Sequence, residues 1–131
     1  METSEEVLAM LDSNEPIVRV YALEVFPRIV GPPTPEQAVK LAKVMICDSG
    51  DPPYIVACEI AGIVATLLAR ATQNAKEAAL EISDFFAITL GSDQQLVEVG
   101  FWEPFESYAS QEGIVLADIK AVQKKVRASA T

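Results

Sequence analysis

The chain has 131 residues, with 19 acidic and 10 basic side chains, no histidine and two cysteines. At this length we expect a single domain over residues 1–131, large enough to bury a core without a metal or a disulfide. The absence of histidine excludes a histidine-based catalytic triad, an imidazole proton shuttle and histidine metal sites. The net charge of −9 argues against nucleic acid as a partner, because phosphate binding requires clustered lysine and arginine.

The N-terminal residues and the apolar stretches indicate a cytoplasmic protein. The chain begins Met-Glu-Thr-Ser-Glu-Glu, which is acidic where a secretory signal would be basic and then apolar. We therefore expect Cys47 and Cys58 to be reduced and to behave as small apolar residues. The longest apolar stretch, residues 54–69, is interrupted by Glu59 and is shorter than the ~20 residues of a membrane span. It predicts a buried helix, and no membrane is expected as a partner.

Apolar residues recur with the helical period through almost the whole chain, which predicts an all-α fold. Thr3 followed by Glu6 forms the pattern of a capping box, and residues 34–37 combine a capping threonine with proline and glutamine. Ser92 with Gln95 gives a similar start. We expect helices over residues 4–11, 15–30, 35–47, 52–71, 74–90, 93–111 and 114–128.

Two prolines fall inside expected helices. Pro27 and Pro104 each remove a backbone donor and crowd the preceding turn, so each should kink or break its helix. Gly100, shortly before Pro104, favours a break at that point. The residues alone leave open whether one bent helix or two short ones form there.

One segment of the chain repeats. Residues 12–16, Asp-Ser-Asn-Glu-Pro, recur as Asp-Ser-Gly-Asp-Pro at residues 48–52, a shift of 36 residues. Apolar residues precede both copies, so the repeating unit is an apolar helix, an acidic turn with proline, and a second apolar helix. A period of roughly 20–50 residues is typical of stacked helical repeats, in which neighbouring units bury each other's apolar faces.

The first copy resembles a HEAT repeat over residues 8–23. The residues that carry the resemblance are Asp12, Asn14, Pro16, Val18, Arg19, Ala22 and Leu23. The second copy, residues 39–71, has Ile55 in place of the arginine, and a divergent third copy would use the helices over 74–90 and 93–111. The resemblance implies a short αα-superhelix, a HEAT-like solenoid of about three helix pairs plus a C-terminal helix, that acts as a binding scaffold.

The alternative fold is a globular helix bundle with the same burial. In the repeat interpretation the helix over residues 52–71 is covered on several sides, and Gly62 lets a neighbouring helix approach closely. Arg19 and Asp12 are expected to form an ion pair within the first repeat, or a turn contact.

The charge is concentrated in residues 77–119. This segment holds nine acids and no lysine or arginine, whereas the rest of the chain holds ten acids and all ten bases. Six of the nine aromatic residues also lie there, of which Phe85 or Phe86 and Phe105 are expected in the core. The others could form an exposed aromatic anchor rimmed by carboxylates, as at many interaction surfaces. The candidate partner-binding residues are Glu98, Phe101, Trp102, Glu103, Glu106 and Tyr108. The alternative is a solvated acidic face that only aids solubility.

These features favour a protein-interaction module or scaffold that binds a protein or peptide of basic character. An immunity protein or inhibitor that neutralises a basic toxin or enzyme fits equally well, and a structural subunit that docks onto another chain is a further option. The sequence has no phosphate loop, paired CxxC, nucleophile elbow or HExxH motif, so no catalytic, metal or cofactor-binding residue is assigned. A carboxylate-based or metal-dependent enzyme is a further alternative, which would use carboxylates such as Glu59 unless that side chain faces solvent or pairs with a base.

Overall fold

The computed structural model describes residues 2–129, with side chains over residues 2–127, and every regular element in this part of the chain is a helix. The expected all-α class is therefore confirmed. By its contacts the chain divides into two compact units, Met1–Gly50 and Asp51–Thr131, which are described separately. The single domain and the superhelical arrangement stay predictions. Among the described helices, none is long and apolar enough to cross a membrane.

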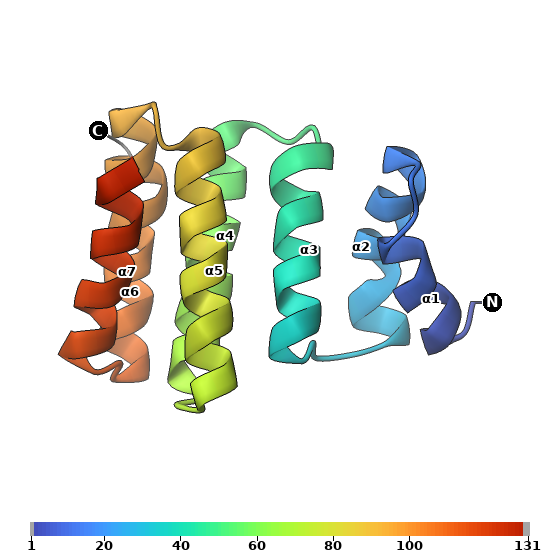
Figure 1. Ribbon diagram of the computed structural model, residues 1–131, viewed down its shortest axis with the longest axis horizontal. Coiled ribbons are helices and arrows are strands. Elements are labelled where there is room, and N and C mark those ends of the chain that lie inside the picture. Colours follow the sequence, from blue (N-terminus) through green and yellow to red (C-terminus); the bar gives the residue numbers. More distant parts are fainter. Residues whose placement is uncertain (1, 130–131) are drawn as a thin grey trace. The chain divides into compact units, whose positions relative to one another are not determined.

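The first unit contains three helices: α1 (Ser4–Leu11), α2 (Pro16–Ile29) and α3 (Pro35–Asp48). The central helix α2 packs against both α1 and α3 (Figure 1). Both predicted capping boxes are present, Thr3 with Glu6 and Thr34 with Gln37. The helices enclose a small apolar core of Val7, Leu11, Ala22, Val25, Phe26, Leu41 and Val44.

Polar contacts join the helices of this unit across the acidic turns. Arg19 donates through Nε and Nη2 to the two carboxylate oxygens of Asp48, at 2.8 and 3.0 Å, and through Nη1 to the carbonyl oxygen of Ser13 at 2.8 Å. Asp12 pairs instead with Lys40 at 3.1 Å. The expected Arg19–Asp12 pair is therefore wrong, whereas the turn contact of Arg19 is confirmed. Asp48 is the residue that corresponds to Asp12 after the 36-residue shift, so Arg19 connects the two copies of the repeated turn.

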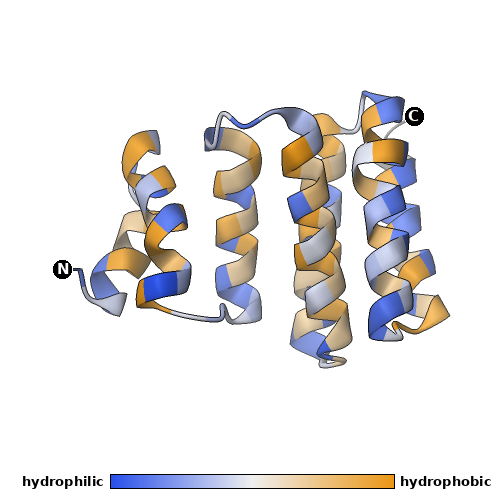
Figure 2. Ribbon diagram, turned by 180° about the vertical axis from the view of Figure 1, so that it is seen from behind, coloured by the Kyte–Doolittle hydropathy of each residue, from blue (hydrophilic) through white to orange (hydrophobic). Residues whose placement is uncertain are grey.

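In the second unit, residues 51–129 form four α-helices and one π-helix: α4 (Pro53–Ala69), α5 (Gln73–Leu90), η1 (Leu96–Trp102), α6 (Glu103–Glu112) and α7 (Leu116–Ser129). Helix α4 packs against α5, η1 and α6, and α7 packs against α5. In Figure 1, α4 and α6 form one layer of this unit and α5 and α7 form the other. Apolar residues recur along α4 (Figure 2), as expected for a helix covered on several sides.

The helix pairs expected from the repeat do not coincide with the two compact units. The two helices of the second pair, α3 and α4, belong to different compact units. Helix α4 packs instead against both partners of the expected third pair, α5 and η1–α6. The superhelix and the alternative of a helix bundle therefore both stay predictions.

The chain does not break at Gly100. Residues 96–102 form the π-helix, and α6 follows directly with Pro104 in its first turn. Proline has no N–H and its ring crowds the carbonyl one turn earlier, so a wider π-turn relieves both problems without ending the helix. Pro27 likewise does not end α2, which continues to Ile29.

The start of this helical stretch differs from the prediction. The Leu96 N–H donates to Oδ1 of Asp93 at 3.1 Å, so Asp93, and not Ser92, caps the helix. Asp93 is a short polar side chain of the kind that caps a helix as readily as serine, which is why the pattern was one residue out of place.

Candidate protein-interaction surface

The acids of residues 77–119 lie mostly on the surface of the second unit. All nine are exposed except Asp84 and Asp118, which are half-buried. Asp118 pairs with Lys76 at 3.5 Å. Four of the exposed acids stand on the continuous stretch formed by η1 and α6, and we call three of them, Glu98, Glu103 and Glu106, the acidic face.

The spacing of the acidic face places its members along one side of this stretch. The N–H of Glu103 bonds to the carbonyl oxygen of Glu98, so these residues are one π-turn apart. Glu106 follows Glu103 by three residues, which is close to one α-turn. Residues 96–112 contain no lysine or arginine, so nothing basic on these two helices interrupts the row.

The aromatic residues of the segment form a core, not an anchor. Phe101 stacks on Phe86 with ring centroids 5.0 Å apart and on Phe105 at 5.8 Å, and Trp102 contacts Phe105 at 5.3 Å. Phe101 is fully buried and Trp102 is only 6% exposed. The expected exposure of Phe101 and Trp102 is therefore wrong, because the helix continues through Pro104 and keeps both rings turned inward. The prediction that Phe105 and either Phe85 or Phe86 lie in the core is confirmed, with Phe86 as the fully buried member of that pair.

Helix α7 supplies one basic contact to the acidic face. Arg127 Nε lies 3.5 Å from Oε1 of Glu98, with both side chains about half exposed. The same guanidinium lies 5.4 Å from the centre of the Trp102 ring. Glu103 and Glu106 have no ion pair among the described residues, so they are the free charges of the acidic face.

Tyr108 is the one aromatic candidate that reaches the surface, with 37% of its area exposed. Its ring covers Gly62, where a side-chain carbon would stand 3.6 Å from the ring edge. This is an ordinary contact distance, so the close approach of a neighbouring helix at Gly62 stays a prediction. A second tyrosine, Tyr54, lies against Gly100 together with Leu96 and Ala57, and is 43% exposed. The sequence interpretation missed Tyr54, although it shares its glycine-facing position with Tyr108.

Glu59 is exposed on α4. The expectation that the Glu59 carboxylate faces solvent is therefore confirmed. The alternative, a buried carboxylate with a catalytic role, does not describe this side chain. Over residues 2–127, no three histidine, cysteine, aspartate or glutamate side chains gather in a way that could hold a metal ion.

Both cysteines are free thiols, but only Cys58 is partly buried. Cys47 is exposed, which corrects its expected role as a buried apolar residue. The pKa of the Cys47 thiol is raised, first by partial desolvation and then by the neighbouring Asp48 carboxylate. A raised pKa keeps the thiol protonated at neutral pH, where it is a poor nucleophile.

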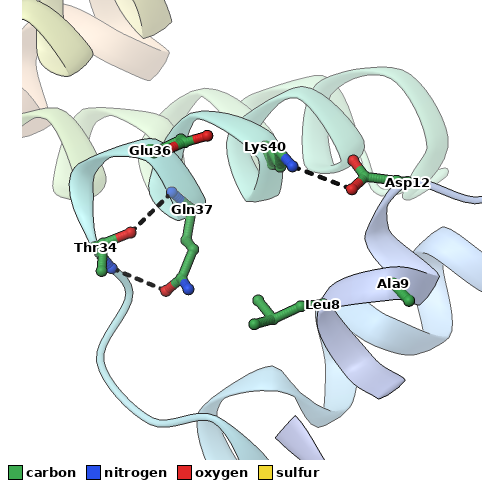
Figure 3. Close-up of a pocket in the computed structure, with 7 residues that line it drawn as sticks. All are labelled: Leu8, Ala9, Asp12, Thr34, Glu36, Gln37 and Lys40. Atoms are coloured by element: carbon green, nitrogen blue, oxygen red, sulfur yellow. Dashed lines mark hydrogen bonds and ion pairs between the residues drawn. The ribbon is translucent and has the colours of Figure 1, made fainter. Parts of the chain in front are cut away.

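The first unit has an open polar pocket of about 310 Å³ between α1 and α3 (Figure 3). Its lining is Leu8, Ala9, Asp12, Thr34, Glu36, Gln37 and Lys40. Four of these polar side chains already bond to one another, in the Thr34–Gln37 capping box and the Lys40–Asp12 ion pair. The pocket is therefore explained by local structure and suggests no ligand.

Comparison with protein-family models, with curated proteins and with solved structures finds no match for this chain.

Proposed function

We propose that this chain is a protein-interaction module of HEAT-like helical repeats, which binds a protein or peptide of basic character through the acidic face. The observation that carries the proposal is the row of exposed carboxylates on η1 and α6, helices that hold no base. The Arg19–Asp48 contact between two copies of the repeated turn supports the repeat interpretation.

Charge complementarity explains what such a row can do. A surface of one sign attracts a partner of opposite sign at long range and disfavours partners of like charge. Because Glu103 and Glu106 have no internal ion partner among the described residues, a partner's lysine or arginine can pair with them without first displacing a base. A basic toxin or enzyme that the chain neutralises is one partner with the required charge.

The test is a charge reversal of the whole acidic face. The variant E98K/E103K/E106K is compared with E15K/E24K/E36K, which makes the same change in net charge at exposed acids of the first unit. The partner is retrieved with the tagged parent chain, identified by mass spectrometry and purified. Its affinity for each variant is then measured at low and at physiological salt.

At low salt we expect the acidic-face variant to bind roughly 100-fold more weakly, from about 1 kcal/mol for each reversed pair. The loss should shrink as salt screens the charges. The first-unit control should change the affinity by less than about threefold. Circular dichroism confirms that each variant is folded. If the partner binds the folded acidic-face variant as tightly as the parent, the proposal is wrong.

A further inference from the structure

Two tyrosine–glycine contacts align α4 with the stretch formed by η1 and α6. Tyr54 of α4 covers Gly100 of η1, and Tyr108 of α6 covers Gly62 of α4. In each contact the two residues are 46 positions apart in the sequence. Residue numbers therefore increase in the same direction along α4 and along the η1–α6 stretch. The helices therefore run parallel and in register, as Figure 1 shows for α4 and α6. We call the surface line marked by Tyr54 and Tyr108 the tyrosine seam.

The two rings of the seam are available to a partner. Tyr54 is 43% exposed and Tyr108 is 37% exposed. Neither hydroxyl bonds to another side chain among the described residues. Tyr54 and Gly62 are eight residues apart on α4, so the two rings stand at levels separated by about 12 Å along the helix axis.

The two helical stretches that form the seam carry charges of one sign. Glu59 lies on α4 between the levels of the two rings, and Glu103 lies between the same levels on the neighbouring stretch. Both carboxylates are exposed. Residues 53–69 and 96–112, which form the two helical stretches, contain no lysine or arginine. A ligand on the seam therefore meets aromatic rings and carboxylates together.

We propose that the tyrosine seam is the docking site for an extended arginine-bearing segment of the basic partner, with one guanidinium stacked on Tyr54 and another on Tyr108. Arginine fits because its planar cation stacks on an aromatic face while it donates hydrogen bonds to a carboxylate. We assign Glu59 and Glu103, the exposed acids at levels between the two rings, as the carboxylates that accept these hydrogen bonds. This inference rests on the proposed function for the charge of the partner and specifies how that partner is recognised.

The spacing of the rings favours an extended segment. Residues four apart in a strand point to the same side and lie about 13 Å apart, close to the separation of the ring levels. In a helix the same face recurs after seven residues, at a rise of about 10.5 Å, so a helical segment matches the separation of the ring levels less closely than a strand does. The expected motif is therefore two arginines separated by three residues.

The test uses a defined peptide, Ac-Gly-Arg-Thr-Val-Thr-Arg-Gly-NH2, whose β-forming middle favours an extended chain. It is titrated into the full, isotope-labelled chain while amide chemical shifts are followed by NMR. We expect saturable shifts confined to residues near Tyr54, Gly62, Gly100 and Tyr108. The same peptide with citrulline in place of arginine keeps the shape but not the charge, and it should bind at least tenfold more weakly.

The variants separate ring stacking from general attraction. Y54L/Y108L should weaken peptide binding at least tenfold, whereas Y54F/Y108F, which keeps the rings, should stay within about threefold of the parent. Tyr21→Leu is the matched control, because Tyr21 is 40% exposed and lies in the first unit. The proposal for the tyrosine seam is wrong if millimolar peptide causes no saturable chemical-shift changes. It is also wrong if Y54L/Y108L binds the peptide as tightly as the parent chain does.

The proposal for the tyrosine seam and the proposal for the acidic face can be disproved independently of each other. E98K/E106K changes the acidic face without altering the residues assigned to the seam. If this variant loses the basic partner but Y54L/Y108L binds it normally, the seam is wrong and the acidic face stands. If Y54L/Y108L loses the partner and E98K/E106K binds normally, the acidic face is wrong and the seam stands.

Discussion

The two compact units have cores of different side-chain composition. The first unit has an aliphatic core with a single aromatic ring, Phe26, and adds the partly buried Arg19–Asp48 pair. The second unit is built around stacked rings, with Phe101 between Phe86 and Phe105. The aromatic residues that first suggested a binding surface in the second unit are therefore what stabilises it. Its exposed surface carries carboxylates and two half-exposed tyrosines.

The largest expected effect comes from opening the aromatic core. Phe101→Ala should lower the free energy of unfolding of the second unit by about 3–5 kcal/mol, because it removes the central ring of the stack and leaves a cavity. Trp102 is the only tryptophan of the chain and is buried beside this stack, so its fluorescence in a urea titration reports the change directly.

Phe26→Ala is the matched substitution in the first unit. It should accelerate hydrogen exchange in α1–α3 while moving the Trp102 transition by less than about 1 kcal/mol, since Phe26 belongs to the other core. An equal shift of the Trp102 transition by both substitutions would mean that the two units unfold as one.

The next effect tests the polar contact of the first unit. Arg19→Met should cost about 2 kcal/mol, because it leaves the Asp48 carboxylate, only 13% exposed, and the Ser13 carbonyl without their donor. Lys40→Met removes a pair whose side chains are 42% and 60% exposed, and it should cost less than about 0.5 kcal/mol. Thermal unfolding of both variants, with Asp48→Asn to complete a double-mutant cycle, measures the difference. Equal losses would show that burial of the pair does not matter.

A smaller effect concerns two glycines of the second unit, Gly62 in α4 and Gly113 at the end of α6. Gly62→Ala should stabilise the second unit by about 0.5–1 kcal/mol, because alanine favours the helix and its methyl group would meet Tyr108 at an ordinary 3.6 Å. Gly113→Ala should destabilise it by about 1 kcal/mol, because Gly113 ends α6 at φ +66°, in the left-handed region. Urea titrations followed by Trp102 fluorescence give both values. Loss of stability in Gly62→Ala would show that the ring of Tyr108 cannot accommodate the added carbon.

Local signals were predicted well, and contacts between distant residues were not. The capping boxes at Thr3 and Thr34 depend on residues three apart, so the sequence alone determines them. The inward orientation of Trp102 depends on a π-turn that fits the packing against neighbouring helices, and no short pattern encodes it. Arg19 has carboxylates available at both Asp12 and Asp48, and only the packing of α2 against α3 decides between them. For the same reason the acidic residues of the candidate surface were found and its aromatic part was misplaced.

The smallest effect is electrostatic and belongs to the edge of the first unit. The hydroxyl of Tyr21 donates to Oε1 of Glu2 at 2.7 Å, and this bond lowers the pKa of Glu2 below its ordinary 4.5. A lowered pKa in the folded state means that the bond stabilises the fold above the ordinary pKa and that this contribution is lost as the pH falls through the lower value. An NMR titration of the Glu2 carboxyl should therefore give a midpoint below 4.5, which rises towards 4.5 in Tyr21→Phe because the largest cause of the lowered pKa is removed. Tyr54→Phe changes a tyrosine of the second unit and should leave the midpoint where it was. If the midpoint does not move in Tyr21→Phe, this hydrogen bond is not the cause of the lowered pKa of Glu2. The Tyr21–Glu2 contact could then not be counted among the polar contacts by which the first unit differs from the second.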